Sequence, residues 1–152
     1  MMAILGVAVA CAEHRDNGTV AVSGEPDLAS VRQSLGMQSF DAGSLIIPMD
    51  NTYQNRGTLK AFGLVFTLIR NSGPVYWTIQ TGKAAGGVDF VASGKDLWDA
   101  GAVTNYGYRG GPFVIDVADR AAAMPIIQGW KDAGNITSLH DVTVPFTAEV
   151  RR

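Results

Sequence analysis

The hydrophobic pattern from residue 44 onward predicts strands alternating with helices. Residues 44–49 (SLIIPM) form a continuous apolar run, which is typical of a strand covered on both faces. Apolar residues then recur at helical spacing over 59–69, with Thr58 available as the N-cap and Asn-Ser-Gly-Pro at 71–74 as the end. Residues 75–79 (VYWTI) are rich in β-branched and aromatic side chains and predict a strand. Together these segments predict a βαβ unit with parallel strands and a right-handed crossover.

A second such unit follows a less regular stretch that extends to Tyr108. Residues 112–115 predict a strand, and residues 117–133 predict a helical region that Pro125 kinks or divides. Apolar and polar residues then alternate over 142–150, which is the clearest period-two pattern in the chain. The predicted fold class is therefore α/β: a three-layer, flavodoxin-like domain with a mainly parallel sheet of about four strands from two βαβ units. Five or more strands are usual in such folds, so either a partner protects the last strand or the chain is part of a longer protein.

The first eleven residues resemble an export leader. The segment 1–10 (MMAILGVAVA) is apolar, and small residues directly precede Cys11, as in a bacterial lipobox. Two departures are Ala8, where such signals prefer Leu, and the lack of a basic residue before the apolar run. The alternatives are an ordinary signal sequence, or a buried segment in which Cys11 is a small hydrophobic residue. The predicted organisation is a leader at 1–11, a polar tether at 12–43 and an α/β domain at 44–152.

Composition narrows the function classes. The chain has 152 residues, 47% of them hydrophobic and 17% charged, which excludes an intrinsically disordered chain. A net charge of −2 and the lack of a basic stripe argue against nucleic-acid binding. A single Cys excludes an intrachain disulfide and a zinc site built on several cysteines. No pattern indicates another metal or a cofactor, so none is expected.

A candidate ligand site follows from the predicted parallel sheet. In open α/β sheets ligands bind beyond the carboxyl ends of the strands, where the loops 50–57 and 80–87 and the turn after Ile115 would meet. A glycine-rich turn at 106–111 could let the backbone approach a ligand or simply shape a tight turn. Ordinary solvated loops with helix caps are the alternative explanation. The candidate ligand-binding residues, suited to a polar ligand, are Asp50, Tyr53, Gln54, Arg56, Lys83, Arg109 and Asp116.

Several segments resemble a group of large, uncharacterised secreted proteins of myxobacteria and their relatives. The resemblance rests on Ile46–Asn55 with 57–63, on Pro74–Trp77, on Gly82 and Lys83, on Gly87–Phe90 and on Arg109–Ile115. The opening region of that group is similar to the class I glutamine amidotransferase-like layout. The resemblance implies a flavodoxin-like fold and a chain that continues further, but it carries over no chemistry, since the amidotransferase Cys nucleophile has no counterpart here.

Two functions follow as hypotheses. No catalytic residues are expected, because Ser138, His140 and Asp141 are too close in sequence to form a triad and no Gly-x-Ser-x-Gly elbow occurs. The first hypothesis is a non-catalytic exported module that binds a polar ligand or a protein partner at the bacterial cell envelope. Its membrane attachment would be a lipidated Cys11. The second is the N-terminal fragment of a larger secreted amidotransferase-like enzyme or adhesin.

Overall fold

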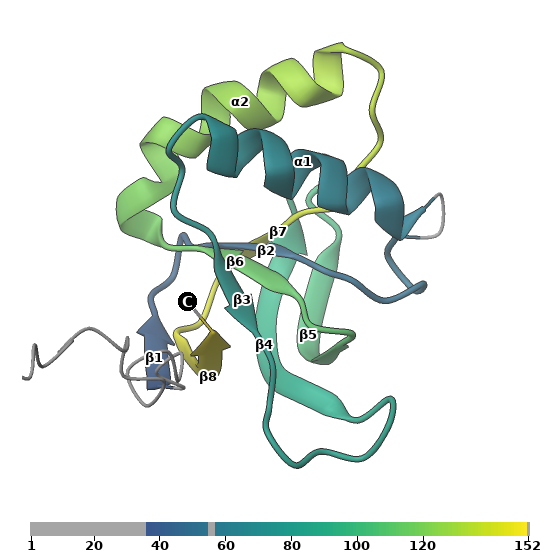
Figure 1. Ribbon diagram of the computed structural model, residues 1–152, viewed down its shortest axis with the longest axis vertical. Helices are drawn as coiled ribbons and strands as arrows, with labels where there is room; N and C mark the ends of the chain where they lie inside the picture. The colour runs from purple at the N-terminus through teal and green to yellow at the C-terminus, as the bar shows by residue number, and fades with distance from the viewer. Residues whose placement is uncertain (1–35, 55–56, 152) are drawn as a thin grey trace, which may run out of the picture. The chain divides into compact units, whose positions relative to one another are not determined.

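The computed structural model describes residues 36–54 and 57–151. The predicted lipidation site Cys11, the leader and the site residue Arg56 lie outside the described residues. Figure 1 shows the described chain. Its elements in chain order are β1 (Gly36–Phe40), β2 (Leu45–Ile47), α1 (Thr58–Arg70), β3 (Tyr76–Thr78), β4 (Val88–Asp96), β5 (Ala102–Arg109), β6 (Phe113–Ile115), the 3₁₀ turn η1 (Val117–Asp119), α2 (Arg120–Asp132), β7 (His140–Val142) and β8 (Phe146–Arg151).

The eight described strands form a single sheet in the order β1-β8-β3-β6-β2-β7-β4-β5. Every neighbouring pair in this sheet is antiparallel. The sheet curls, so β4 and β8 approach each other although they are not hydrogen-bonded neighbours. Across this curl the rings of Phe90 and Phe146 stack with centroids 4.7 Å apart.

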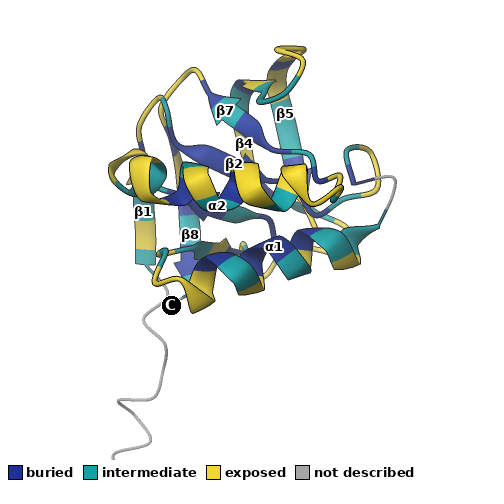
Figure 2. Cartoon of the chain, turned by 90° about the horizontal axis from the view of Figure 1, so that it is seen from above, coloured by how far each residue is buried: buried dark blue, intermediate teal, exposed yellow. Residues whose placement is uncertain are grey.

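Both α-helices lie on one side of the sheet (Figure 2). Helix α1 begins after its N-cap Gly57, whose φ of 124° favours glycine, so the predicted N-cap Thr58 is instead the first residue of the helix. It ends at Asn71, whose backbone N–H and side-chain amide both donate to carbonyls of the last turn. Helix α2 follows η1 directly and is continuous through Pro125, so the proline does not divide it. The two helices confirm the helical spacing predicted for these segments.

Two apolar layers cover the two faces of the sheet. The layer between the sheet and the helices contains Leu45, Ile47, Leu64, Leu68, Ile115, Ile127 and Leu139. The layer inside the curl contains Phe40, Ile46, Phe90, Tyr108, Val114, Val142, Phe146 and Val150. Strand β2 is fully buried because alternate residues enter different layers.

The predicted parallel α/β sheet is wrong. Strands β2 and β3 do run in the same direction, because each is antiparallel to β6, but β6 lies between them. A continuous apolar run requires cover on both faces, and here the helices supply one cover and the curled sheet supplies the other. The flavodoxin-like and amidotransferase-like layouts both require a parallel sheet, so they are overturned as well.

The irregular stretch before Tyr108 contains the two longest described strands, β4 and β5, which form a hairpin. Register shifts between Val88 and Phe90 and between Ala92 and Gly94 interrupt the alternation of apolar residues. The predicted strand at 142–150 is two strands, β7 and β8, separated by exposed Val144. The sheet also begins at Gly36, within the residues that the sequence assigned to the tether, because β1 pairs with β8.

Candidate functional site

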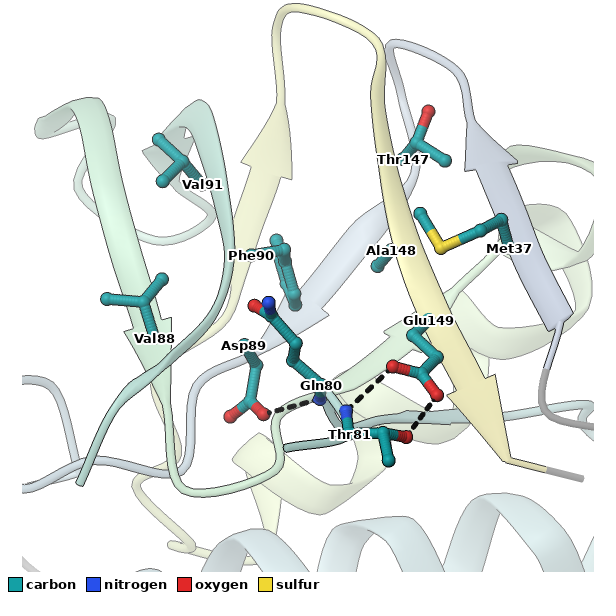
Figure 3. Close-up of a pocket in the computed structure, with 10 residues that line it drawn as sticks. All are labelled: Met37, Gln80, Thr81, Val88, Asp89, Phe90, Val91, Thr147, Ala148 and Glu149. Atoms are coloured by element: carbon teal, nitrogen blue, oxygen red, sulfur yellow. Dashed lines mark hydrogen bonds between the residues drawn. The ribbon is translucent and has the colours of Figure 1, made fainter. Parts of the chain in front are cut away.

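A pocket of about 440 Å³ lies where β4 approaches β8 inside the curl (Figure 3). Its apolar surface comes from Met37 on β1, from Val88, Phe90 and Val91 on β4, and from Ala148 on β8. Its polar residues are Gln80, Thr81, Asp89, Thr147 and Glu149. We call this the β4–β8 pocket. It exists only because the sheet curls, since β4 and β8 belong to different parts of the strand order.

Glu149 is the carboxylate on the β8 side of this pocket. Its two oxygens accept from Thr81, one from the backbone N–H at 2.7 Å and the other from the hydroxyl. These hydrogen bonds lower the pKa of Glu149 below its usual value, and the positive charge of Arg151 adds to the effect. The carboxylate is therefore ionised at neutral pH. Each oxygen keeps a lone pair for a further donor, since a carboxylate offers about four acceptor positions.

Asp89 has a different role, because its charge is already balanced. Its side chain is fully buried and lies 2.5 Å from the Lys83 ammonium. It also accepts from the backbone N–H groups of Gln80 at 2.9 Å and Gly111 at 3.0 Å. A buried carboxylate with these three partners is a structural anchor. It fixes the loop between β3 and β4, including the backbone of Gln80, whose side chain Figure 3 shows beside Phe90.

The structure separates the residues of the predicted polar rim. Asp116 follows Ile115, which pairs with Leu45 at the start of β2, whereas Asp50 follows the end of β2. In this antiparallel pair the end of β6 lies beside the start of β2, so Asp116 and Asp50 lie at opposite ends of the strands and cannot form one site. Asp116 instead caps η1 by accepting from the Ala118 N–H at 2.9 Å.

The remaining predicted residues fall into two groups. Lys83 pairs with Asp89 behind the β4–β8 pocket. Asp50 accepts a hydrogen bond from the Tyr106 hydroxyl at 3.1 Å, and the rings of Tyr53 and Tyr106 meet edge to face at 4.8 Å. Burial raises the pKa of Tyr106, and the nearby positive charge of Arg109 opposes that shift.

Gln54 exchanges two hydrogen bonds with the backbone of Ser138, one to its carbonyl and one from its N–H. The Ser138 hydroxyl donates to the carbonyl of Tyr53 at 2.8 Å. Gln54 therefore fastens the loop after β2 to the chain before β7. Because its amide is engaged in this way and buried, it serves the fold rather than a ligand.

Sequence reasoning missed the buried pair behind this loop. The Tyr108 hydroxyl lies 2.7 Å from His140 Nδ1, and both residues are completely buried. Tyr53 closes the pair from outside, with its ring 4.2 Å from the imidazole and perpendicular to it. Because both residues are sealed from solvent, the pair cannot touch a substrate in this conformation. The two residues are 32 positions apart, so no local pattern could have paired them.

Two further findings bound the chemistry of the described chain. Residues 36–54 and 57–151 contain no group of three or more His, Cys, Asp or Glu side chains arranged to hold a metal ion. Neither described α-helix has the length and apolar character that crossing a membrane requires.

Comparison with known proteins supplies no relative. No family model, no curated protein and no solved structure matches the chain.

Proposed function

We propose that the described domain is a non-catalytic binding module whose β4–β8 pocket takes a small ligand with an ammonium group and a short apolar body. The observation that carries this proposal is the ionised Glu149 beside an apolar wall. Pockets of this kind bind through apolar contact and use a few polar groups to orient the ligand.

The charges around the pocket favour a cation over an anion. The Lys83 ammonium is engaged by Asp89, so it does not offset Glu149. The Arg151 guanidinium lies over the Trp77 ring, 5.9 Å from its centroid. What remains at the pocket surface is the Glu149 carboxylate together with the side-chain amide of Gln80, whose carbonyl oxygen is a second acceptor. An ammonium group would donate to both, and the apolar body would lie against Phe90 and Ala148.

The test uses two probes that share an apolar body and differ in charge, phenethylamine and 3-phenylpropionate. We expect calorimetry on the full chain to detect the amine and not the acid. Glu149→Gln keeps the shape and a hydrogen bond to Thr81 but removes the charge, so it should weaken amine binding about tenfold, as expected for one charge-assisted hydrogen bond.

Asp116→Asn is the matched control, because it removes a carboxylate that caps η1 and does not line the pocket. Its amine affinity should equal that of the unchanged protein. Equal binding of both probes, binding of neither, or the same loss in Asp116→Asn would each refute the assignment of a cation site at Glu149.

Export and lipidation at Cys11 complete the proposal. An acyl group on Cys11 would hold the module at the bacterial cell envelope, where it meets small ligands from outside the cell. Intact mass spectrometry of the protein from its native cells should then show an acylated species that begins at Cys11. A species that retains residues 1–10 and carries no lipid would contradict the envelope location and leave the pocket assignment unaffected.

A further inference from the structure

Helix α1 has two apolar faces, and the sheet uses only one of them. Ala61, Leu64, Val65 and Leu68 are buried against the sheet. A second row, Leu59, Phe62, Phe66 and Ile69, follows the spacing i, i+3, i+7, i+10 and is 51–84% exposed. An amphipathic helix of a globular domain ordinarily needs only the buried face, with polar residues opposite it. The outer side of α1 therefore calls for an explanation beyond folding (Figure 2).

The exposed row continues onto the sheet. The Phe62 ring meets Phe113 edge to face at 5.9 Å, and Phe113 stacks on Trp77 at 6.4 Å. Trp77 is itself 40% exposed. We call the surface made by Leu59, Phe62, Phe66, Ile69 and Trp77 the aromatic face. A contiguous exposed surface of this composition marks an interaction site more often than scattered apolar residues do.

Cations border the aromatic face on two sides. The Arg70 guanidinium lies 5.6 Å from the centroid of Phe66, and the Arg151 guanidinium lies 5.9 Å from that of Trp77. Helix α1 contains no Asp or Glu along its whole length. A hollow of about 220 Å³ adjoins Phe66 and Arg70 and is completed by Thr67 and Asn71. This places a cation, a hydroxyl and an amide around a space beside the apolar row.

We propose that the aromatic face rests on a lipid bilayer with anionic headgroups. Phe, Leu and Ile would enter the boundary between headgroups and acyl chains, and Trp77 would lie at headgroup depth, as amphipathic aromatic rings do. Arg70 and Arg151 would bind lipid phosphates. The Asn71 amide would add a donor at the hollow, whereas the Thr67 hydroxyl already donates to the Gly63 carbonyl at 2.8 Å.

Charge favours the bilayer over a second copy of the chain. Two copies joined through this face would bring cationic borders together, and like charges oppose association. An anionic membrane surface instead attracts basic residues. The inference does not rest on the β4–β8 pocket, because none of the five residues of the aromatic face lines that pocket and the partner is of another class.

The test is cosedimentation of the full chain carrying Cys11→Ser, which removes any acyl group at residue 11. Vesicles of phosphatidylcholine alone are compared with vesicles of phosphatidylcholine and phosphatidylglycerol in equal parts. We expect binding to the anionic vesicles to be about tenfold stronger. The double substitution Phe62→Ser/Phe66→Ser should lose about tenfold, and Arg70→Glu should remove the preference for anionic lipid.

Val144→Ser is the matched control, since Val144 is equally exposed but belongs to neither α1 nor β3. It should bind as the parent does. Brominated acyl chains should also quench Trp77 fluorescence in the bound protein, and Trp77→Phe should remove that part of the quenching.

Four outcomes would overturn the proposal. They are equal binding to both vesicles, binding to neither, the same loss in Val144→Ser, and a dimer at micromolar concentration that Phe62→Ser abolishes. Thermal unfolding in the absence of lipid distinguishes an exposed aromatic face from one that another part of the chain covers. A truly exposed face predicts that Phe62→Ser/Phe66→Ser changes Tm by only about 2 °C or less. A large drop in Tm would mean that protein, not lipid, covers the aromatic face.

Discussion

His140 is a titratable residue placed where its charged form is costly. Its side chain is fully buried, its Nδ1 faces the Tyr108 hydroxyl, and its Nε2 has no hydrogen-bond partner among the described residues. Burial lowers the pKa of His140, and the carboxylates of Asp96, Asp50 and Asp99 only partly oppose that shift. Burial likewise raises the pKa of Tyr108, so both members of the pair are neutral at pH 7.

This shift predicts a loss of stability in mild acid. When folding lowers the pKa of a histidine, the residue contributes fully to the free energy of unfolding above its unfolded-state pKa of about 6.5. This contribution is lost as the pH falls toward the folded-state pKa. Below about pH 6.5 the imidazole of His140 binds a proton in the unfolded chain but stays neutral in the folded chain. The free energy of unfolding should therefore fall by up to about 1.4 kcal/mol per pH unit below pH 6.5. Urea titrations at pH 7.5 and pH 5.5 measure this difference in the free energy of unfolding.

Replacement by a residue that does not titrate provides the control. His140→Gln should flatten the dependence between these two pH values. The same dependence in His140→Gln as in the parent would show that His140 is not its source.

Some candidate residues could be named from their place in the sequence, and others could not. Asp50 and Tyr53 were named as candidates from their place after a strand, and the structure groups them with Tyr106. Glu149 was not named, because its partner Thr81 is 68 positions away and only the curl brings them together. Pairings at that separation leave no trace in local spacing.

At the scale of elements, the contact between α1 and α2 depends on one glycine. A Cβ atom on Gly63 would lie 2.7 Å from the ring of Trp130. That ring cannot move freely, because its Nε1 donates to the Thr137 hydroxyl at 3.0 Å and it packs on the core. Gly63 therefore allows the two helices to approach each other.

Gly63→Ala should destabilise the protein even though alanine favours helix. Overpacking at such a contact costs about 1–3 kcal/mol, which exceeds the propensity gain of about 1 kcal/mol. Gly129, on α2, is a matched control, because a Cβ there would meet nothing within 4 Å. Gly129→Ala should stabilise by about 0.5–1 kcal/mol. Chemical unfolding of both variants decides the matter, and equal effects of the two substitutions would contradict the packing role of Gly63.

Elements with a regular period were predictable, and those with interrupted periods were not. The helical spacing of α1 and the alternation of Phe146, Ala148 and Val150 in β8 both correspond to the observed burial. Strands β4 and β5 were missed because register shifts move apolar residues out of alternation. Strand β1 (GMQSF) has no alternation of apolar and polar residues, so only its pairing with β8 identifies it as a strand.

At the scale of the whole molecule, the strand order predicts where the fold opens first. Strands β2 and β6 have neighbours on both sides and supply fully buried residues, whereas β1 and β5 are the edges of the sheet. Amide hydrogen exchange should therefore be slowest in β2 and β6 and fastest in β1. Protection of β1 equal to that of β2 would argue against the order described here.

The sequence by itself determined the burial pattern of those elements whose apolar residues follow a regular period. Strand β2 had to be covered on both faces, α1 had to bury one side, and β8 had to alternate, since these follow from the local period of apolar residues. Strand direction and order were decided only by the tertiary structure. A buried apolar run can be covered by helices or by another part of a curled sheet, and the sequence of the run is the same in both cases. The pocket at Glu149 and the pair at His140 depend on that choice, because each joins residues from strands that are distant along the chain.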